Sequence, residues 1–224
     1  MFLFFFLGLY NNLINLLPEE IHARIYLGLN LLILFILFAY SHKYLKLNIR
    51  ELGYDTKYIL SSLGIGFFFS IVIILLFVFA LRLLPRIGIT IKKPFVDIGS
   101  SGELFYRLLL RIPFGTAFFE ENLFRGIFYG YLVRRYSTKR VFFITSLFFA
   151  IWHIVPAMEV VTSNFQITLH FAGIGLWLFL VIGAFLAGLF FTLLRFWGKS
   201  IIGCIIAHSL INDLALLVIY FLWK

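Results

Sequence analysis

The chain has 224 residues, of which 62% are hydrophobic and 13% are charged, and its formal net charge is +9. Water-soluble domains typically carry about 25% charged residues, and disordered chains carry more charge and less apolar surface, so both classes are excluded. The single cysteine excludes a disulfide scaffold, and the basic residues lie between long apolar runs, which argues against a nucleic-acid-binding domain. The composition predicts a polytopic membrane protein.

Charged residues mark the ends of the predicted spans, because a helix that crosses a membrane needs about 20 mostly apolar residues. We expect an all-α bundle of about seven transmembrane helices that forms a single integral-membrane domain over residues 1–224. The expected helices occupy residues 1–18, 25–40, 57–82, 104–133, 140–156, a part of 159–195, and 200–223. The first resembles a signal peptide in its apolar core, although it contains Asn11, Asn12 and Asn15. It lacks a basic start and an obvious cleavage site, so we expect it to be retained.

The connection at residues 42–57 mixes apolar residues with charges, which predicts a short helix along the membrane interface. Its apolar members are Leu47, Ile49, Leu52 and Tyr54. Basic residues are more numerous in one set of alternate connections than in the other. The richer set is Lys43, Lys46, Arg50, Lys57, Arg134, Arg135, Lys139, Arg140, Arg195 and Lys199, and the poorer set is Arg24, Arg86, Lys92, Lys93 and Lys224. The positive-inside rule therefore places the richer set and the N-terminus in the cytoplasm, and the C-terminus outside.

The expected helix at residues 104–133 is unusual because it holds charged residues within a span, which are costly there and mark a functional site by default. These are Arg107, Arg111, Glu120, Glu121 and Arg125. Two later helices carry His153, His208 and Asn212. At about 1.5 Å per residue, these three side chains and Glu120 lie roughly 14–21 Å from the basic boundaries, near the middle of a ~30 Å hydrocarbon core. The sequence therefore predicts one active site buried near mid-membrane.

Spacing within that helix separates its two glutamates. Glu121 and Arg125 stand four residues apart with the acid first, which is the favourable order for an ion pair. Glu120 then points about 100° away, toward a different partner. We expect the Glu121–Arg125 pair to be structural and Glu120 to face the site.

The later helices repeat a four-residue spacing. His208 and Asn212 share a helix face, and Phe149 precedes His153 by one turn, so its ring can cover the imidazole. Small residues at the same spacing favour close packing of helices around the site. The small pairs are Gly126/Gly130, Gly183/Ala187, Ala184/Gly188 and Gly203/Ala207.

Three motifs thus follow one another between residues 104 and 214. They are Glu120-Glu121-x-x-x-Arg125, Phe149-x-x-x-His153 and His208-x-x-x-Asn212. In this order they resemble the motifs of the CAAX prenyl endopeptidase and bacteriocin-processing (CPBP, or ABI) family of glutamic-type intramembrane proteases, in a prokaryotic-type member. The resemblance implies an endopeptidase of the cell (plasma) membrane that cuts a membrane-associated peptide or protein, with or without a lipid anchor. It implies no nucleic-acid partner.

The resemblance also implies a role for each motif residue. Glu120 activates the attacking water, and His153 helps to hold that water. His208 and Asn212 correspond to residues that form an oxyanion hole. The remaining motif residues, Glu121, Arg125 and Phe149, correspond to structural positions. Peptide hydrolysis independently needs a base for water and donors for the developing oxyanion, so the residue types agree with the chemistry.

Two other site chemistries remain open on the sequence alone. Glu120, His153 and His208 could bind Zn²⁺ with water in the fourth position, but the chain lacks a His-Glu-x-x-His motif, so we favour a site without a metal cofactor. Cys204 shares a helix face with His208, which suggests a cysteine nucleophile. Nothing in the sequence indicates a base that would activate its thiol, and we expect a small buried side chain.

Two other classes of function also remain open. A proton-coupled transporter would use intramembrane glutamate and histidine, but it predicts internal repeats, and the sequence contains none. A non-catalytic immunity or scaffold protein would retain the protease fold without its activity. The polar residues outside the motifs, His22, His42, His170, Arg107 and Arg111, are expected to be interfacial or structural.

Overall fold

The computed structural model describes residues 2–83, 86, 98–164 and 171–222, and within these ranges the chain forms helices and turns with no strand. The predicted all-α fold is therefore confirmed for the described residues. The helices in chain order are α1 (Phe2–Ile14), α2 (Glu19–Lys43), η1 (Thr56–Tyr58), α3 (Ile59–Leu83), α4 (Ser101–Tyr106), η3 (Arg107–Phe118), α5 (Phe119–Glu121), η4 (Asn122–Phe128), α6 (Tyr129–Val133), α7 (Thr138–Trp152), α8 (Ile154–Glu159), η5 (Val160–Asn164), α9 (Phe171–Gly198) and α10 (Ile202–Leu222).

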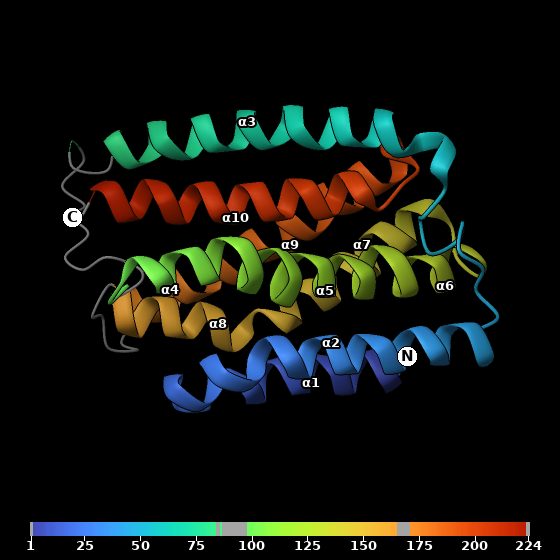
Figure 1. Cartoon of the computed structure of the whole chain (residues 1–224), viewed down its shortest axis with the longest axis horizontal. Coiled ribbons are helices and arrows are strands. Elements are labelled where there is room, and N and C mark those ends of the chain that lie inside the picture. The colour runs from blue at the N-terminus through green and yellow to red at the C-terminus, as the bar shows by residue number, and fades with distance from the viewer. Residues whose placement is uncertain (1, 84–85, 87–97, 165–170, 223–224) are drawn as a thin grey trace.

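The longer helices run side by side along the long axis of the molecule (Figure 1). Helices α3 and α10 pack together on one flank, α1 and α2 lie on the other, and the continuous segment from α4 to α6 passes between them. This segment contacts both α2 and α10. The charged helix predicted at residues 104–133 therefore lies at the centre of the bundle.

Helices α2, α3, α9 and α10 are long and apolar enough to cross a membrane, and α7 and α8 form a fifth candidate span that is bent by 51°. Helix α1 has 13 residues, or about 20 Å, which is shorter than a ~30 Å hydrocarbon core. The segment from α4 to α6 carries six charged residues, so it is too charged to qualify as a span by hydropathy alone. The predicted count of seven spans therefore stays a prediction.

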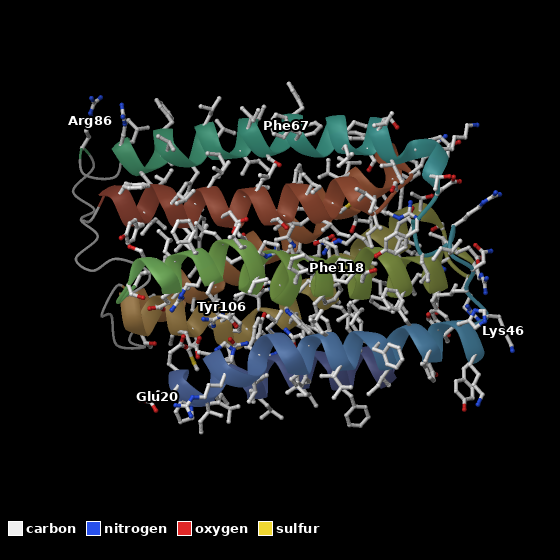
Figure 2. All side chains as sticks on the ribbon, viewed as in Figure 1. Glu20, Lys46, Phe67, Arg86, Tyr106 and Phe118 are labelled. Carbon is white, nitrogen blue, oxygen red and sulfur yellow. The ribbon has the colours of Figure 1, made fainter. Side chains whose placement is uncertain are left out.

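The outer surface of α3 is apolar, as a lipid-facing surface requires. Figure 2 shows Phe67 on the outer side of this helix, and Leu60 and Leu75 are also more than half exposed. Lys46 and Glu20 lie toward opposite ends of the bundle in the same view. Apolar residues thus cover the length of the outer helix, and the labelled charges lie near opposite ends of the bundle.

The connection at residues 44–55 forms turns, and the interfacial helix predicted there is absent. Leu47 and Leu52 are buried in the main core, and Gly53, with a φ of +93°, accepts a hydrogen bond from the backbone N–H of Ile201 at 2.9 Å. The apolar residues of this connection are thus drawn into the bundle, because they have a core to enter. Arg134 binds Glu51 across the same end of the bundle, which brings the three basic connections of the richer set together.

The side of the membrane that this end faces stays a prediction, and Lys92, Lys93 and Lys224 of the poorer set lie outside the described residues.

The segment from α4 to α6 is a helix with two widened stretches, η3 and η4. Pro113 lies inside η3, where it lacks an N–H and disrupts the normal turn-to-turn hydrogen bonding. Helix α2 supports this stretch, because the side-chain amide of Asn30 donates to the carbonyl oxygen of Gly115 at 2.9 Å. Tyr26 lies within 3.3 Å of the Thr116 hydroxyl. These contacts fix the turn that directly precedes Glu120.

The helix predicted at residues 140–156 is interrupted at His153, whose φ of −100° and ψ of 11° depart from helical values. The reason is Pro156, which cannot donate a backbone hydrogen bond to Trp152, four residues earlier, and whose ring crowds that carbonyl. The chain bends here between α7 and α8. His153 therefore lies at the bend itself, outside the regular turns of α7 and α8.

Two of the predicted small pairs contain a point of close helix approach. A Cβ atom at Gly188 of α9 would lie 2.8 Å from the Cα atom of Ser146 in α7, and one at Gly203 would lie nearly on the backbone oxygen of Ser62 in α3. Gly183 differs, since a Cβ atom there would meet no atom within 4 Å. This glycine lines a cavity, described below.

Candidate active site

The carboxylate of Glu120 lies inside the bundle and is 3% exposed. Its Oε1 atom accepts a hydrogen bond from the indole Nε1 of Trp152 at 3.0 Å. Its Oε2 atom is buried, has no hydrogen-bond partner among the described residues, and lies 3.9 Å from Nε2 of His153. One oxygen of the carboxylate is therefore fixed by the protein, and the other faces a histidine at more than hydrogen-bond distance.

The imidazole of His153 is oriented by the helix turn that precedes it. Its Nδ1 atom lies 2.8 Å from the carbonyl oxygen of Phe149. A carbonyl can only accept, so Nδ1 carries a proton and Nε2 is directed toward Glu120. The Phe149 ring lies 4.5 Å from the imidazole, centroid to centroid, as the four-residue spacing predicts. His153 is thus held at one nitrogen and available for chemistry at the other.

Glu121 faces a different helix from its neighbour and is fully buried. Its Oε1 atom accepts hydrogen bonds from Nη1 of Arg125 at 3.1 Å and from Nδ1 of His208 at 2.8 Å. The predicted Glu121–Arg125 ion pair is confirmed. The adjacent glutamates therefore divide their contacts, with Glu120 toward α7 and Glu121 toward α10.

The guanidinium of Arg125 has no exposed surface and lies within a cage of aromatic rings. It stands 4.3 Å from the centroid of Phe149 and 5.2 Å from that of Phe191. Its Nη2 atom donates to the carbonyl oxygen of Gly188 at 3.0 Å. Arg125 thereby joins the charged segment to α7 and α9, which suits a structural role.

His208 stacks on the ring of Phe191, with centroids 4.8 Å apart and planes 22° apart. Because its Nδ1 atom donates to Glu121, its second nitrogen is left for another partner. His208 and Asn212 both line a cavity of about 520 Å³. His153 lines the same cavity, so the two later motifs meet there.

The walls of this cavity are mostly apolar, and three of its residues on α9 are small. The lining comprises Ile73, Thr116, Phe149, His153, Gly183, Ala184, Leu186, Ala187, Phe190, Phe191, His208, Ile211 and Asn212. Glu120 does not line the cavity, but its carboxylate lies 3.9 Å from His153, which does. The arrangement therefore places a buried carboxylate beside an apolar chamber that two histidines and an amide enter.

The family model for the Type II CAAX prenyl endopeptidase Rce1-like proteins matches residues 102–214, about half of the chain. The chain belongs to this family. The predicted membership of the CPBP proteases is thus confirmed, over nearly the same residues as the predicted motif region. No curated protein and no solved structure matches the chain significantly. Membership of this endopeptidase family, together with the long apolar helices, identifies an integral membrane protein of the CAAX prenyl endopeptidase type.

The residues expected to be interfacial or structural do not line the cavity where the structure describes them, namely His22, His42, Arg107 and Arg111. His22 and Arg111 contact each other at the N-terminal end of α2, with Arg111 paired to Glu19. His42 lines a second cavity, of about 620 Å³, beside the connection at residues 44–55. The predicted His170 lies outside the described residues. Cys204 is buried, as predicted, and its thiol lies 3.4 Å from the carbonyl oxygen of Phe191.

Three residues that contact the motifs were not predicted from the sequence. Trp152 binds Glu120, while Asn11 and Asn12 of α1 bind the backbone around the break at His153. A signal existed for each. A buried indole N–H needs an acceptor, and amides in an apolar helix need partners, as intramembrane charges do.

The donor set does not form a ready metal site in the described part of the chain. There, no three histidine, cysteine, aspartate or glutamate side chains gather closely enough to hold a metal ion. Glu120 and His153 approach each other, but His208 is engaged by Glu121 at its Nδ1 atom. Of the two histidines in the zinc hypothesis, His153 therefore faces Glu120, whereas His208 binds Glu121.

Proposed function

We propose that this member of the endopeptidase family hydrolyses a peptide bond of a membrane-associated substrate by using Glu120 as the base. The observation that carries the proposal is the buried Oε2 atom of Glu120, which has no hydrogen-bond partner in the described part of the chain and lies 3.9 Å from Nε2 of His153. A direct hydrogen bond does not span this distance, but one water molecule can bind both atoms. A buried carboxylate next to an imidazole is the arrangement expected of a general base.

In the proposed reaction, the water donates one hydrogen bond to Glu120 Oε2 and one to His153 Nε2. Its oxygen lone pair then attacks the carbonyl carbon of the scissile peptide bond while Glu120 takes a proton. The tetrahedral intermediate collapses when the C–N bond breaks and the same proton passes to the leaving amine. Trp152 holds the Oε1 atom throughout, so only Oε2 carries the proton.

We propose that Asn212 and His208 stabilise the negative charge that develops on the carbonyl oxygen. The Asn212 amide can donate in every protonation state of the site. His208 already donates from Nδ1 to Glu121, so it donates a second hydrogen bond from Nε2 only when doubly protonated. Asn212 is therefore the more dependable oxyanion donor.

The shape and lining of the cavity support an apolar group in the substrate. A volume of about 520 Å³ with walls from α3, α9 and α10 is large enough for several apolar side chains or part of a lipid chain. We propose a membrane-associated peptide or protein as substrate, with or without a lipid anchor, in the plasma membrane. We further propose that the reaction needs no metal.

The test uses the full chain, purified and reconstituted in lipid nanodiscs. Quenched fluorescent peptides that end in the Cys-aliphatic-aliphatic-X sequence would be supplied with and without a prenyl group on the cysteine. Cleavage by the parent protein and none by the Glu120→Gln variant is expected. Equal cleavage by both proteins would overturn the assignment of Glu120. Peptides that accumulate in native membranes only with the active protein would then identify the physiological substrate.

A further inference from the structure

The side chain of Asn12 in α1 inserts into the backbone of α7 at the point where that helix breaks. Its Nδ2 atom donates to the carbonyl oxygen of Ile151 at 2.9 Å, and its Oδ1 atom accepts from the backbone N–H of Val155 at 2.7 Å. In an unbroken helix, that N–H would donate directly to that carbonyl, since the two residues are four apart. The Asn12 amide thus bridges the backbone N–H and the carbonyl that would otherwise bond to each other directly.

Asn11 satisfies the other group that the break exposes. Its Nδ2 atom donates to the carbonyl oxygen of Trp152 at 2.7 Å, and the side chain is 3% exposed. This is the carbonyl that Pro156 leaves without a helical donor. A buried carbonyl without a partner is strongly unfavourable in a membrane, so the break needs an outside donor.

The two residues held in this way, Trp152 and His153, are those that contact the two oxygens of Glu120. Ile151 and Val155 lie on either side of them and are fixed by one amide. We infer that Asn11 and Asn12 are positioning residues, which act through this break to aim Trp152 and His153 at Glu120. This inference rests on the proposed function, because it assigns catalytic value to that geometry.

A merely structural role for the asparagines would link α1 to α7 without affecting the geometry at Glu120. A matched control is Asn15, in the turn that directly follows α1. The Asn15 side chain donates only to the carbonyl oxygen of Asn11 in α1, and it makes no contact with α7 among the hydrogen bonds of the described residues. Its substitution removes a membrane amide but leaves the break untouched.

The experiment compares Asn11→Ala, Asn12→Ala and Asn15→Ala in the full-length protein with two measurements. The first is kcat and KM on the peptide that the parent cleaves fastest. The second is the ¹⁵N–¹H resonance of the Trp152 indole in detergent micelles, assigned by its loss in Trp152→Phe. Glu120→Ala supplies the resonance position of an indole that has lost its carboxylate acceptor.

We expect Asn11→Ala and Asn12→Ala to lower kcat by about 10- to 100-fold with KM within twofold, because displacements near 1 Å have effects of this size. The Trp152 resonance should move toward its position in Glu120→Ala, and Asn15→Ala should change neither measurement. If Asn12→Ala does not accumulate, Asn12→Gln keeps both amide groups and displaces them by one methylene.

An unmoved Trp152 resonance in Asn11→Ala and Asn12→Ala would overturn the inference, whatever happens to kcat. A moved resonance with parental kcat would also overturn it, because the geometry would then lack catalytic value. If the parent cleaves no peptide, the proposed function fails and the catalytic part of this inference fails with it. The resonance still decides whether the two asparagines hold Trp152 on Glu120, so the two failures are distinguishable.

Discussion

The indole N–H of Trp152 donates to Oε1 of Glu120 across 3.0 Å, although the two residues are 32 positions apart in the chain. Both side chains are almost completely buried. The bond makes the two oxygens of one carboxylate unequal, since one is occupied and the other is turned to His153. The adjacent Glu121 has a different pattern, with both of its partners on one oxygen.

The adjacent glutamates should respond differently to substitution. Glu120→Gln keeps an oxygen that can accept from Trp152, so the protein should fold with an unchanged Tm while peptide hydrolysis is lost. Glu121→Ala leaves Arg125 buried without its carboxylate, which should lower stability by about 3–5 kcal/mol. Thermal unfolding and cleavage rates of the purified variants test this division. Equal stability and equal loss of activity in both variants would contradict it.

Asn212 should affect the rate of the chemical step more than the binding of substrate. Removal of one oxyanion donor lowers kcat by about 10²–10³ in other hydrolases, so Asn212→Ala should lose activity in this range with a modest change in KM. Steady-state kinetics on the cleaved peptide measure both constants. An Asn212→Ala variant with a raised KM and an unchanged kcat would assign this amide to substrate binding.

Removal of metal should leave activity intact if Glu120 acts directly on water. Exhaustive chelation of the purified protein is expected to have no effect, and elemental analysis should find no stoichiometric zinc. A deeply bound ion can escape a chelator, so both measurements are needed. About one zinc per chain, lost together with activity and also lost in His153→Ala or His208→Ala, would recast Glu120 as a ligand or as a base beside zinc-bound water.

The close contact between α7 and α9 should make Gly188 intolerant of a side chain. A Cβ atom there would lie 2.8 Å from the Cα atom of Ser146, so the helices must separate in Gly188→Ala. Gly183→Ala is the matched control on the same helix, where a Cβ atom meets nothing within 4 Å and a helical alanine is intrinsically preferred by about 1 kcal/mol. Tm should fall in the first variant and be unchanged or rise in the second. A Gly188→Ala protein as stable as the parent would show that the contact can relax.

The ion pair between Glu51 and Arg134 should give the protein a pH-dependent contribution to stability. Partial burial raises the pKa of Glu51, but hydrogen bonds from Arg134 and from the backbone N–H of Asn48 outweigh it, so the pKa lies below its ordinary 4.5. A group with a lowered folded-state pKa stabilises above its unfolded value, and the effect disappears as pH falls through the folded value. The Tm difference between parent and Glu51→Gln should be constant above about pH 5 and vanish in more acidic buffer. A difference that persists unchanged at the acid end would exclude this linkage.

The central charged helix could be predicted because its residues violate a strong rule. An ion in an apolar span is expensive, so Glu120, Glu121 and Arg125 stood out without any structure. Their division between partners followed from helix geometry alone, because adjacent positions point about 100° apart. Local spacing thus predicted the Glu121–Arg125 pair correctly.

The break at His153 was missed for the opposite reason. Pro156 was visible, but a proline can either kink a helix or lie harmlessly near its end, and the choice depends on what receives the freed carbonyl. Here the receiver is Asn11, which lies 141 positions earlier in the chain. The connection at residues 44–55 was similarly mispredicted, because Leu47 and Leu52 enter a core whose other members come from distant helices. Long-range partners of this kind have no local signature.

The site draws on α1, α7 and α10, which are synthesised at different times, so its parts become available one after another. Asn12 is synthesised 139 residues before Ile151, which at about 5–20 residues per second is a delay of roughly 7–28 s. His208 and Asn212 follow later still, so a nascent chain that already contains Glu120 and His153 does not yet contain the proposed oxyanion donors. Under the proposed mechanism, the site is therefore complete only after α10 has been synthesised and has joined the bundle. The same mechanism predicts that the nascent chain does not cleave neighbouring membrane proteins while it is being synthesised.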